Sequence, residues 1–122
     1  LWDLYPSFLS LAGIRSNQPQ DGISLLPNWL QKGKQEKHDY LYWEFHENDG
    51  RQAIRWKRWK AVKLAVMKNE KAPLELYDLQ NDPEEQHNVA SQKPRLVKKL
   101  AALIEKAHTP NPDWPLLKKE IK

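Results

Sequence analysis

The sequence predicts an α+β fold, in which a four-stranded antiparallel sheet has one long helix packed on one face and a helical segment precedes it. Residues 38–66 alternate apolar and polar side chains with period two between turn signals, which indicates half-buried strands. Residues 94–107 repeat apolar side chains at helical spacing. Six Trp, four Tyr and two Phe among 122 residues supply enough apolar surface for a core. These patterns favour a two-layer α+β arrangement.

The first hairpin is predicted from its alternation and its turn. The strand covers residues 40–46, and Asp49-Gly50 has the composition of a two-residue type I′ turn. Counting outward from that turn pairs Glu44 with Arg55 on the solvent face. The four side chains that then share the predicted core face are Trp43, Phe45, Ile54 and Trp56.

The second turn allows two registers. A two-residue Lys57-Arg58 turn would put Val62 opposite Ala53, on the face predicted to be polar. We prefer a bulge at Trp59, which pairs Ile54 with Val62 and Gln52 with Leu64. Residues 74–79 (LELYDL) form a fourth predicted strand.

The opening 37 residues are predicted to be helical at two places. Residues 1–14 form the first helix, which Asp3 caps and Gly13 ends. Ser24 caps a short second helix over residues 25–31. The apolar stripe of the first helix consists of Leu4, Phe8, Leu11 and Ala12. Because so short a segment cannot bury this stripe alone, we expect the chain to be part of a longer protein.

After the fourth strand, Asp82 and Glu85 have the spacing of a capping box around a single helical turn. A long helix starts near Pro94 and should lie across the apolar face of the sheet. Its predicted core stripe is Leu96, Val97, Leu100, Leu103, Ile104 and Ala107. Residues 108–122 hold three prolines and are expected to be irregular.

Composition excludes several kinds of site. There is no cysteine, so no disulfide or thiolate site can form within these residues. No run approaches the roughly 18 apolar residues of a membrane span. No Gly-rich phosphate loop, paired-His zinc motif or G-x-S-x-G elbow is present. The four histidines are scattered, which predicts no metal site. The net charge of +4 suits an anionic partner without requiring one.

Two groups of residues are candidates for binding. Glu44 and His46 share one strand face, where they could line a cleft, although Glu44 could instead only form an ion pair with Arg55. Residues 51–63 contain six basic and no acidic side chains, interleaved with Trp56 and Trp59. Such a pattern could bind a polyanion, for example single-stranded nucleic acid. A solvated basic face is the preferred interpretation, and we expect no nucleic-acid or membrane partner.

Four motifs together resemble type I, formylglycine-dependent sulfatases of the arylsulfatase kind. Residues 3–14 (DLYPSFLSLAGI) and 21–27 (DGISLLP) are similar to the family's "DLxPTxLxLAGI … DGxSLxP". Residues 52–62 (QAIRWKRWKAV) resemble its hairpin "AVRxGxWKxV", with Lys57 and Arg58 in the turn where that pattern has its usual Gly. Residues 76–90 (LYDLQNDPEEQHNVA) resemble "LYDLxxDPxExxNLA". Order and spacing agree over nearly the whole chain.

The resemblance implies that residues 1–37 are the tail end of a large alkaline-phosphatase-like α/β domain with its connector. Residues 38–122 are then the C-terminal sulfatase subdomain. In that family, a formylglycine made within C/S-x-P-x-R attacks sulfur beside a calcium ion. Residues 16–20 (SNQPQ) do not have this motif. We therefore expect no catalytic residue, metal ligand or cofactor in this fragment, which alone should be inactive.

The resemblance also implies partners and a role. The partners are the N-terminal sulfatase domain and a sulfated carbohydrate or aryl sulfate, in a periplasmic or secreted enzyme. The fragment would complete the fold and wall the substrate cleft. Glu44, His46 and Arg51 are the candidate substrate-binding residues, because the family places this hairpin at the cleft mouth. The alternative function is a free-standing basic module that binds a polyanion, either nucleic acid or sulfated glycan.

Overall fold

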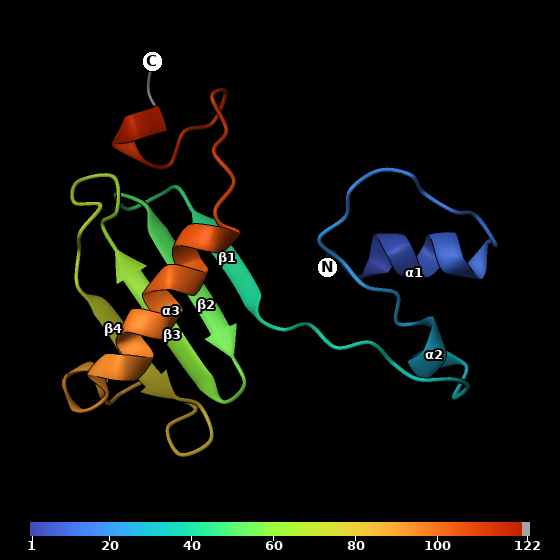
Figure 1. The fold of residues 1–122 in the computed structure, drawn as a ribbon, viewed down its shortest axis with the longest axis horizontal. Coiled ribbons are helices and arrows are strands. Elements are labelled where there is room, and N and C mark those ends of the chain that lie inside the picture. The colour runs from blue at the N-terminus through green and yellow to red at the C-terminus, as the bar shows by residue number, and fades with distance from the viewer. Residues whose placement is uncertain (121–122) are drawn as a thin grey trace. The chain divides into compact units, whose positions relative to one another are not determined.

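The computed structural model describes residues 1–120, apart from the side chain of Lys119. The chain forms two compact units, Leu1–Asp39 and Tyr40–Lys122 (Figure 1). The first unit contains two helices, α1 (Leu4–Leu11) and α2 (Leu26–Trp29). The second contains the sheet, the long helix and two short 3₁₀ segments.

Polar contacts at the start of α1 join the segments of the first unit. The predicted capping role of Asp3 is wrong, because its carboxylate makes no cap hydrogen bond. Asp3 Oδ1 instead accepts from the Ile23 N–H at 2.9 Å and lies 2.8 Å from Nε2 of His38. Burial opposes ionisation, but these contacts outweigh it and lower the pKa of Asp3. Gly13 follows α1 with φ of +69°, as expected of a residue that ends a helix.

The apolar stripe of α1 is exposed. Phe8 and Leu11 keep 57% and 60% of their surface accessible, whereas the buried residue of the helix is Ser7. The Ser7 hydroxyl accepts from the N–H of Leu25 at 2.8 Å, which ties α1 to the start of α2. The predicted cap at Ser24 is wrong by one residue, because Leu25 is the N-cap of α2, although Ser24 Oγ does accept from the Leu26 N–H at 3.3 Å.

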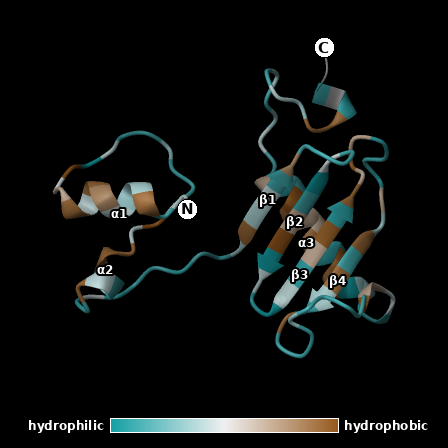
Figure 2. Ribbon diagram, turned by 180° about the vertical axis from the view of Figure 1, so that it is seen from behind, coloured by the Kyte–Doolittle hydropathy of each residue, from teal (hydrophilic) through white to brown (hydrophobic). Residues whose placement is uncertain are grey.

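The second unit confirms the predicted fold class. Its four strands are antiparallel in the order β1-β2-β3-β4, and α3 (Pro94–Ala107) lies across one face of the sheet (Figure 1). Figure 2 presents the opposite face of the sheet. The strands are β1 (Leu41–Phe45), β2 (Arg51–Trp56), β3 (Trp59–Leu64) and β4 (Leu74–Asp78). The short segments are η1 (Ala90–Gln92) and η2 (Lys118–Glu120).

The main core lies between α3 and the sheet. Ile54, Ala61 and Leu76 form a row across three strands, and all three have no accessible surface. Leu100 and Ile104 of α3 pack on them, and the rest of the predicted helix stripe except Ala107 packs around this cluster. Burial of a large aliphatic side chain contributes about 1.5–3 kcal/mol, and this cluster buries Ile54, Leu76, Leu100 and Ile104.

The predicted register of the first hairpin is wrong. Phe45 pairs with Arg51 and Trp43 with Ala53, so both aromatic side chains lie on the face opposite α3. Phe45 is 47% and Trp43 37% exposed, while Ile54 and Trp56 do face the helix as predicted. The cause is the connection, which contains five residues (46–50) instead of a two-residue turn. Asn48, Asp49 and Gly50 all adopt positive φ there.

The predicted bulge at Trp59 is also wrong. Trp56 pairs directly with Trp59 and Ala53 with Val62, so the turn has only Lys57 and Arg58. Lys57 takes φ of +57°, the left-handed conformation that explains Gly at this place in the family pattern. In this register Ala61 faces the helix, so Val62 lies on the opposite face of the sheet, which was predicted to be polar.

The loop after β4 is not a helical turn, so the predicted capping box is wrong. The Asp82 carboxylate accepts from the N–H groups of Gln86 and His87 at 3.0 and 2.8 Å. Glu85 adopts φ of +58°, which interrupts any helix, and its carboxylate lies 2.6 Å from Nζ of Lys60. Asp82 therefore organises a compact loop by accepting backbone hydrogen bonds.

Candidate functional site

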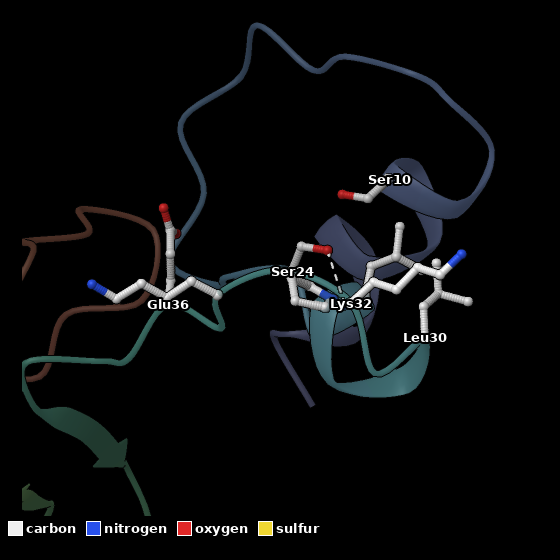
Figure 3. Close-up of a pocket in the computed structure, with 8 residues that line it drawn as sticks. Ser10, Ser24, Leu30, Lys32 and Glu36 are labelled. Carbon is white, nitrogen blue, oxygen red and sulfur yellow. Dashed lines mark hydrogen bonds between the residues drawn. The ribbon is translucent and has the colours of Figure 1, made fainter.

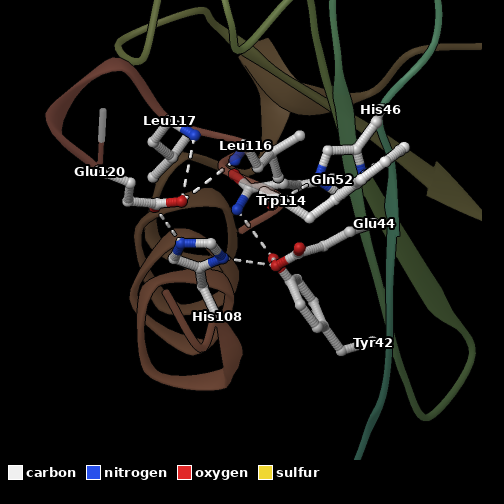
Figure 4. Close-up of polar contacts among 9 residues, drawn as sticks. All are labelled: Tyr42, Glu44, His46, Gln52, His108, Trp114, Leu116, Leu117 and Glu120. Atoms are coloured by element: carbon white, nitrogen blue, oxygen red, sulfur yellow. Dashed lines mark hydrogen bonds and ion pairs between the residues drawn. The ribbon is translucent and has the colours of Figure 1, made fainter. Parts of the chain in front are cut away.

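A network of polar side chains joins the end of α3 to β1 (Figure 4). His108 directly follows α3, and its Nδ1 lies 2.5 Å from Oε1 of Glu44 on β1. Its Nε2 forms a hydrogen bond with Oε1 of Glu120. The Tyr42 hydroxyl donates to Glu44 at 2.6 Å and accepts from the Gln52 amide at 2.8 Å. We call Glu44, His108 and Glu120 the carboxylate–histidine clamp.

The electrostatics of the clamp favour a charged histidine. Burial alone would lower the pKa of His108, but the hydrogen bonds and charges of Glu44 and Glu120 outweigh burial and raise that pKa. Burial would raise the pKa of Glu120, yet His108 and two backbone N–H groups lower it. Burial and the neighbouring Glu44 raise the pKa of Tyr42, so its hydroxyl remains a donor. These contacts favour the imidazolium form of His108.

The clamp fixes the segment that follows α3. Glu120 Oε2 accepts from the N–H groups of Leu116 and Leu117 at 3.0 and 3.4 Å. Leu116 and Leu117 form a second buried cluster with Val66, beside the β1–β2 connection. A Cβ at Gly50 would lie 2.8 Å from Met67 Cγ, so the close packing there needs glycine.

This packing places Trp114 against His46. The two rings are 5.5 Å apart between centroids and meet edge to face at 65°. His46 Nε2 lies 3.2 Å from the carbonyl oxygen of Trp114. Trp114 nevertheless keeps 64% of its surface exposed. The segment after α3 thus presents an aromatic ring to solvent beside His46.

A hollow of about 430 Å³ opens beside this pair. It is lined by His46, Glu47, Met67, Asp113, Trp114 and Pro115. An aromatic ring with an imidazole and carboxylates is suited to bind a molecule that has both apolar faces and hydroxyl groups. A second hollow of about 420 Å³ in the first unit is bordered by Ser10, Ser24, Leu30, Lys32 and Glu36 among others (Figure 3).

The three predicted binding residues lie in three different environments. Glu44 faces the helix and is engaged in the clamp, so its predicted place on a solvent face is wrong, and so is its pairing with Arg55. His46 does reach a hollow. Arg51 starts β2 opposite Phe45, is exposed, and does not line that hollow.

His108, Glu120 and Trp114 were missed by the sequence reasoning. All three lie in residues 108–122, which carry no periodicity, and His108 is 64 positions from its partner Glu44. The only local signal is that His108 ends an amphipathic helix. Nothing in its neighbourhood indicates two carboxylate partners.

Within residues 1–120, no group of three or more His, Cys, Asp or Glu side chains is arranged to hold a metal ion. None of these residues is therefore assigned to the calcium that the family resemblance implies. Over the same range, every helix is too short or too polar to cross a membrane.

Comparison with known proteins decides the family. Residues 2–109 match the family described as N-sulphoglucosamine sulphohydrolase, C-terminal. The chain belongs to this family. The resemblance to the C-terminal region of sulfatases is thereby confirmed.

Individual relatives agree with this sulfatase assignment. Arylsulfatase K of Gallus gallus is 33% identical over 113 residues, covering 85% of this chain and 21% of that protein. Delta 4,5-hexuronate-2-O-sulfatase of Bacteroides thetaiotaomicron is 33% identical over 105 residues, with 81% and 21% covered. The solved structure of a 2-O GAG sulfatase gives a TM-score of 0.73 at 27% identity, covering 86% of this chain and 23% of that one. The sulfatase C-terminal region described here thus spans about a fifth of the length of such relatives.

Proposed function

We propose that this chain is the part of a sulfuric ester hydrolase that completes the fold and walls one side of the substrate cleft. In this proposal, residues 1–37 are the end of the large α/β domain and residues 38–122 are the C-terminal subdomain. The nucleophile, a formylglycine, and the calcium ion belong to the N-terminal domain of a periplasmic or secreted enzyme. The fragment contributes recognition and no chemical step, and alone it is inactive.

The observation that carries this proposal is the hollow beside His46 and Trp114. Sulfated sugars offer ring faces that pack on an indole, and hydroxyls that can donate to the ring nitrogen of His46 that does not face the Trp114 carbonyl oxygen. A curated relative and a solved structure bear names that specify 2-O-sulfatases of sugars, whereas other relatives are named Arylsulfatase K. We choose a sulfated glycan because the hollow combines an indole face with polar groups. His46 is the proposed substrate contact, and Glu44 is a positioning residue, because it holds His108, whose other partner Glu120 accepts from the backbone two residues after Trp114.

The test compares two substrates in the full-length enzyme. We expect His46→Ala to lower kcat/KM on a sulfated disaccharide by about 10-fold or more, which corresponds to about 1.4 kcal/mol. Hydrolysis of a small aryl sulfate should stay nearly unchanged, because the lost contacts reach only the sugar. His87→Ala is the matched control, since His87 is 79% exposed in a loop away from the hollow. Equal losses on both substrates, or none, would show that His46 does not recognise the substrate.

A further inference from the structure

Two tryptophans and four cations gather at the end of the sheet where β2 turns into β3. Trp56 and Trp59 are paired across the hairpin and border the core under α3. Nζ of Lys57 lies 4.7 Å and Nζ of Lys99 3.8 Å from the ring centre of Trp56. Arg58 and Lys93 lie over Trp59 at 4.9 and 5.4 Å. Residues from a hairpin, a loop and a helix thus converge on one patch.

Most of this positive charge is uncompensated. Arg58 has a carboxylate partner, because its Nη2 lies 3.0 Å from Oδ2 of Asp78. Over residues 1–120, no ion pair joins Lys57, Lys93 or Lys99 to an acidic side chain. All three lysines are exposed. Each cation–π contact contributes only about 0.5–1 kcal/mol at an exposed site, while gathered like charges repel one another.

We propose that Lys57, Lys93 and Lys99 form a binding surface for a polyanionic sulfated glycan, separate from the hollow at His46. The indole rings hold the three ammonium groups in place, so less side-chain freedom is lost when sulfate groups bind. The choice of a sulfated glycan over other polyanions rests on the proposed function. The surface is a secondary contact for a long chain and takes no part in hydrolysis.

Distance separates this surface from the hollow. β2 begins next to the 46–50 connection, which holds His46, and ends at Trp56, next to the lysines. A strand of this length spans about 20 Å. A disaccharide in the hollow would therefore not touch the lysines, whereas a long chain could contact both. The lysines should matter for polymer binding and not for small substrates.

The experiment measures binding of a heparin chain of defined length to the full-length enzyme at several salt concentrations. We expect the triple variant Lys57→Gln, Lys93→Gln, Lys99→Gln to bind heparin at least 10-fold more weakly at low salt. The magnitude of the slope of log affinity against log salt concentration should decrease by about two, because each lost lysine–sulfate contact lowers that magnitude by roughly 0.7–0.9. The matched control is Lys71→Gln, Lys98→Gln, Lys106→Gln, which removes the same charge away from the tryptophans and should change affinity less than twofold. The Lys→Arg triple variant should restore binding, because guanidinium groups keep both charge and ring contact.

Other outcomes would overturn the proposal. Equal loss in both glutamine variants would mean that only net charge matters, and no loss would mean that heparin binds elsewhere. Single-stranded oligothymidine binding through these lysines as tightly as heparin would identify a nucleic-acid surface instead. Hydrolysis of a small aryl sulfate, measured in parallel, tests the proposed function independently and should be the same in all variants.

Discussion

Nδ1 of His108, the first residue after α3, lies 2.5 Å from Oε1 of Glu44 on β1. This contact, completed by Glu120 on the other ring nitrogen, holds the 108–120 segment against the sheet. His108 and Glu120 keep only 6% and 4% of their side-chain surface exposed. The position of Trp114 therefore depends on a largely buried charged pair.

Replacing the central histidine should release that segment. His108→Ala leaves Glu44 and Glu120 without their shared partner, so we expect the free energy of unfolding to fall by about 1.5–3 kcal/mol, the range for hydrogen bonds to charged groups. Amide hydrogen exchange at Leu116 and Leu117 should accelerate more than exchange in β2. His87→Ala should change neither quantity, and unchanged exchange at Leu116 in His108→Ala would contradict the clamp.

The clamp should also depend on pH in a defined direction. The pKa of His108 is raised, so its contribution to stability is present below the unfolded value of about 6.5 and is lost as pH rises through the folded value. The pKa of Glu120 is lowered, so its contribution is present above about 4.3 and is lost on acidification. Docking should therefore be tightest between about pH 4.3 and 6.5. Tryptophan fluorescence should report release of the segment as pH rises above about 6.5, and both His108→Gln and Trp114→Phe should abolish that transition.

Two truncations distinguish the two faces of the sheet. Leu76→Ala removes a fully buried side chain of β4 that packs against α3, so it should cost about 2–5 kcal/mol of unfolding free energy. Phe45→Ala removes a side chain that is 47% exposed on the opposite face, and its cost should be well below that of Leu76→Ala. Urea unfolding measures the loss of unfolding free energy in both variants. If Phe45→Ala proved the costlier change, the observed register of the first hairpin would be wrong.

The left-handed turn residue offers a stabilising substitution. A non-glycine residue in the left-handed backbone conformation costs roughly 1–2 kcal/mol. Glycine avoids this cost, but it adds an entropic penalty of about 0.5–1 kcal/mol. Lys57→Gly, at φ of +57°, should therefore stabilise the unit by about 0.5–1 kcal/mol while removing one cation from Trp56. A midpoint of thermal unfolding that falls would argue against the turn conformation.

The sequence predicted the elements better than their pairing. Helix α3 and the four strands followed from periodicity, because the stripe of α3 and the alternation of β1 are regular. The face of β1 could not be decided by alternation, since Tyr42 lies on one side and Trp43 and Phe45 on the other. The aromatic side chains Trp43 and Phe45 led to the wrong face of β1 being predicted as the core face. The length of the connection to β2 sets which face of β1 meets the helix. Asp49-Gly50 suggested a two-residue turn, whereas the connection has five residues.

The candidate site was predictable only in part. His46 was singled out because it stands beside a turn, and it does line a hollow. Its neighbour Trp114 is brought there by the clamp, a contact between residues far apart in the chain. Such contacts depend on how α3 ends and how the following segment returns to the sheet. Local sequence patterns carry no information on that return.

The most direct test of the central claim is a crystal structure of the full-length enzyme, with its nucleophile replaced, bound to a sulfated disaccharide. We predict that a sugar ring packs on the Trp114 indole and that a hydroxyl lies within hydrogen-bonding distance of His46, about 2.7–3.2 Å. The reacting sulfate ester should face residues outside this chain. A saccharide bound in the catalytic centre without any contact to residues 38–120 would contradict the role of this region as a wall of the substrate cleft.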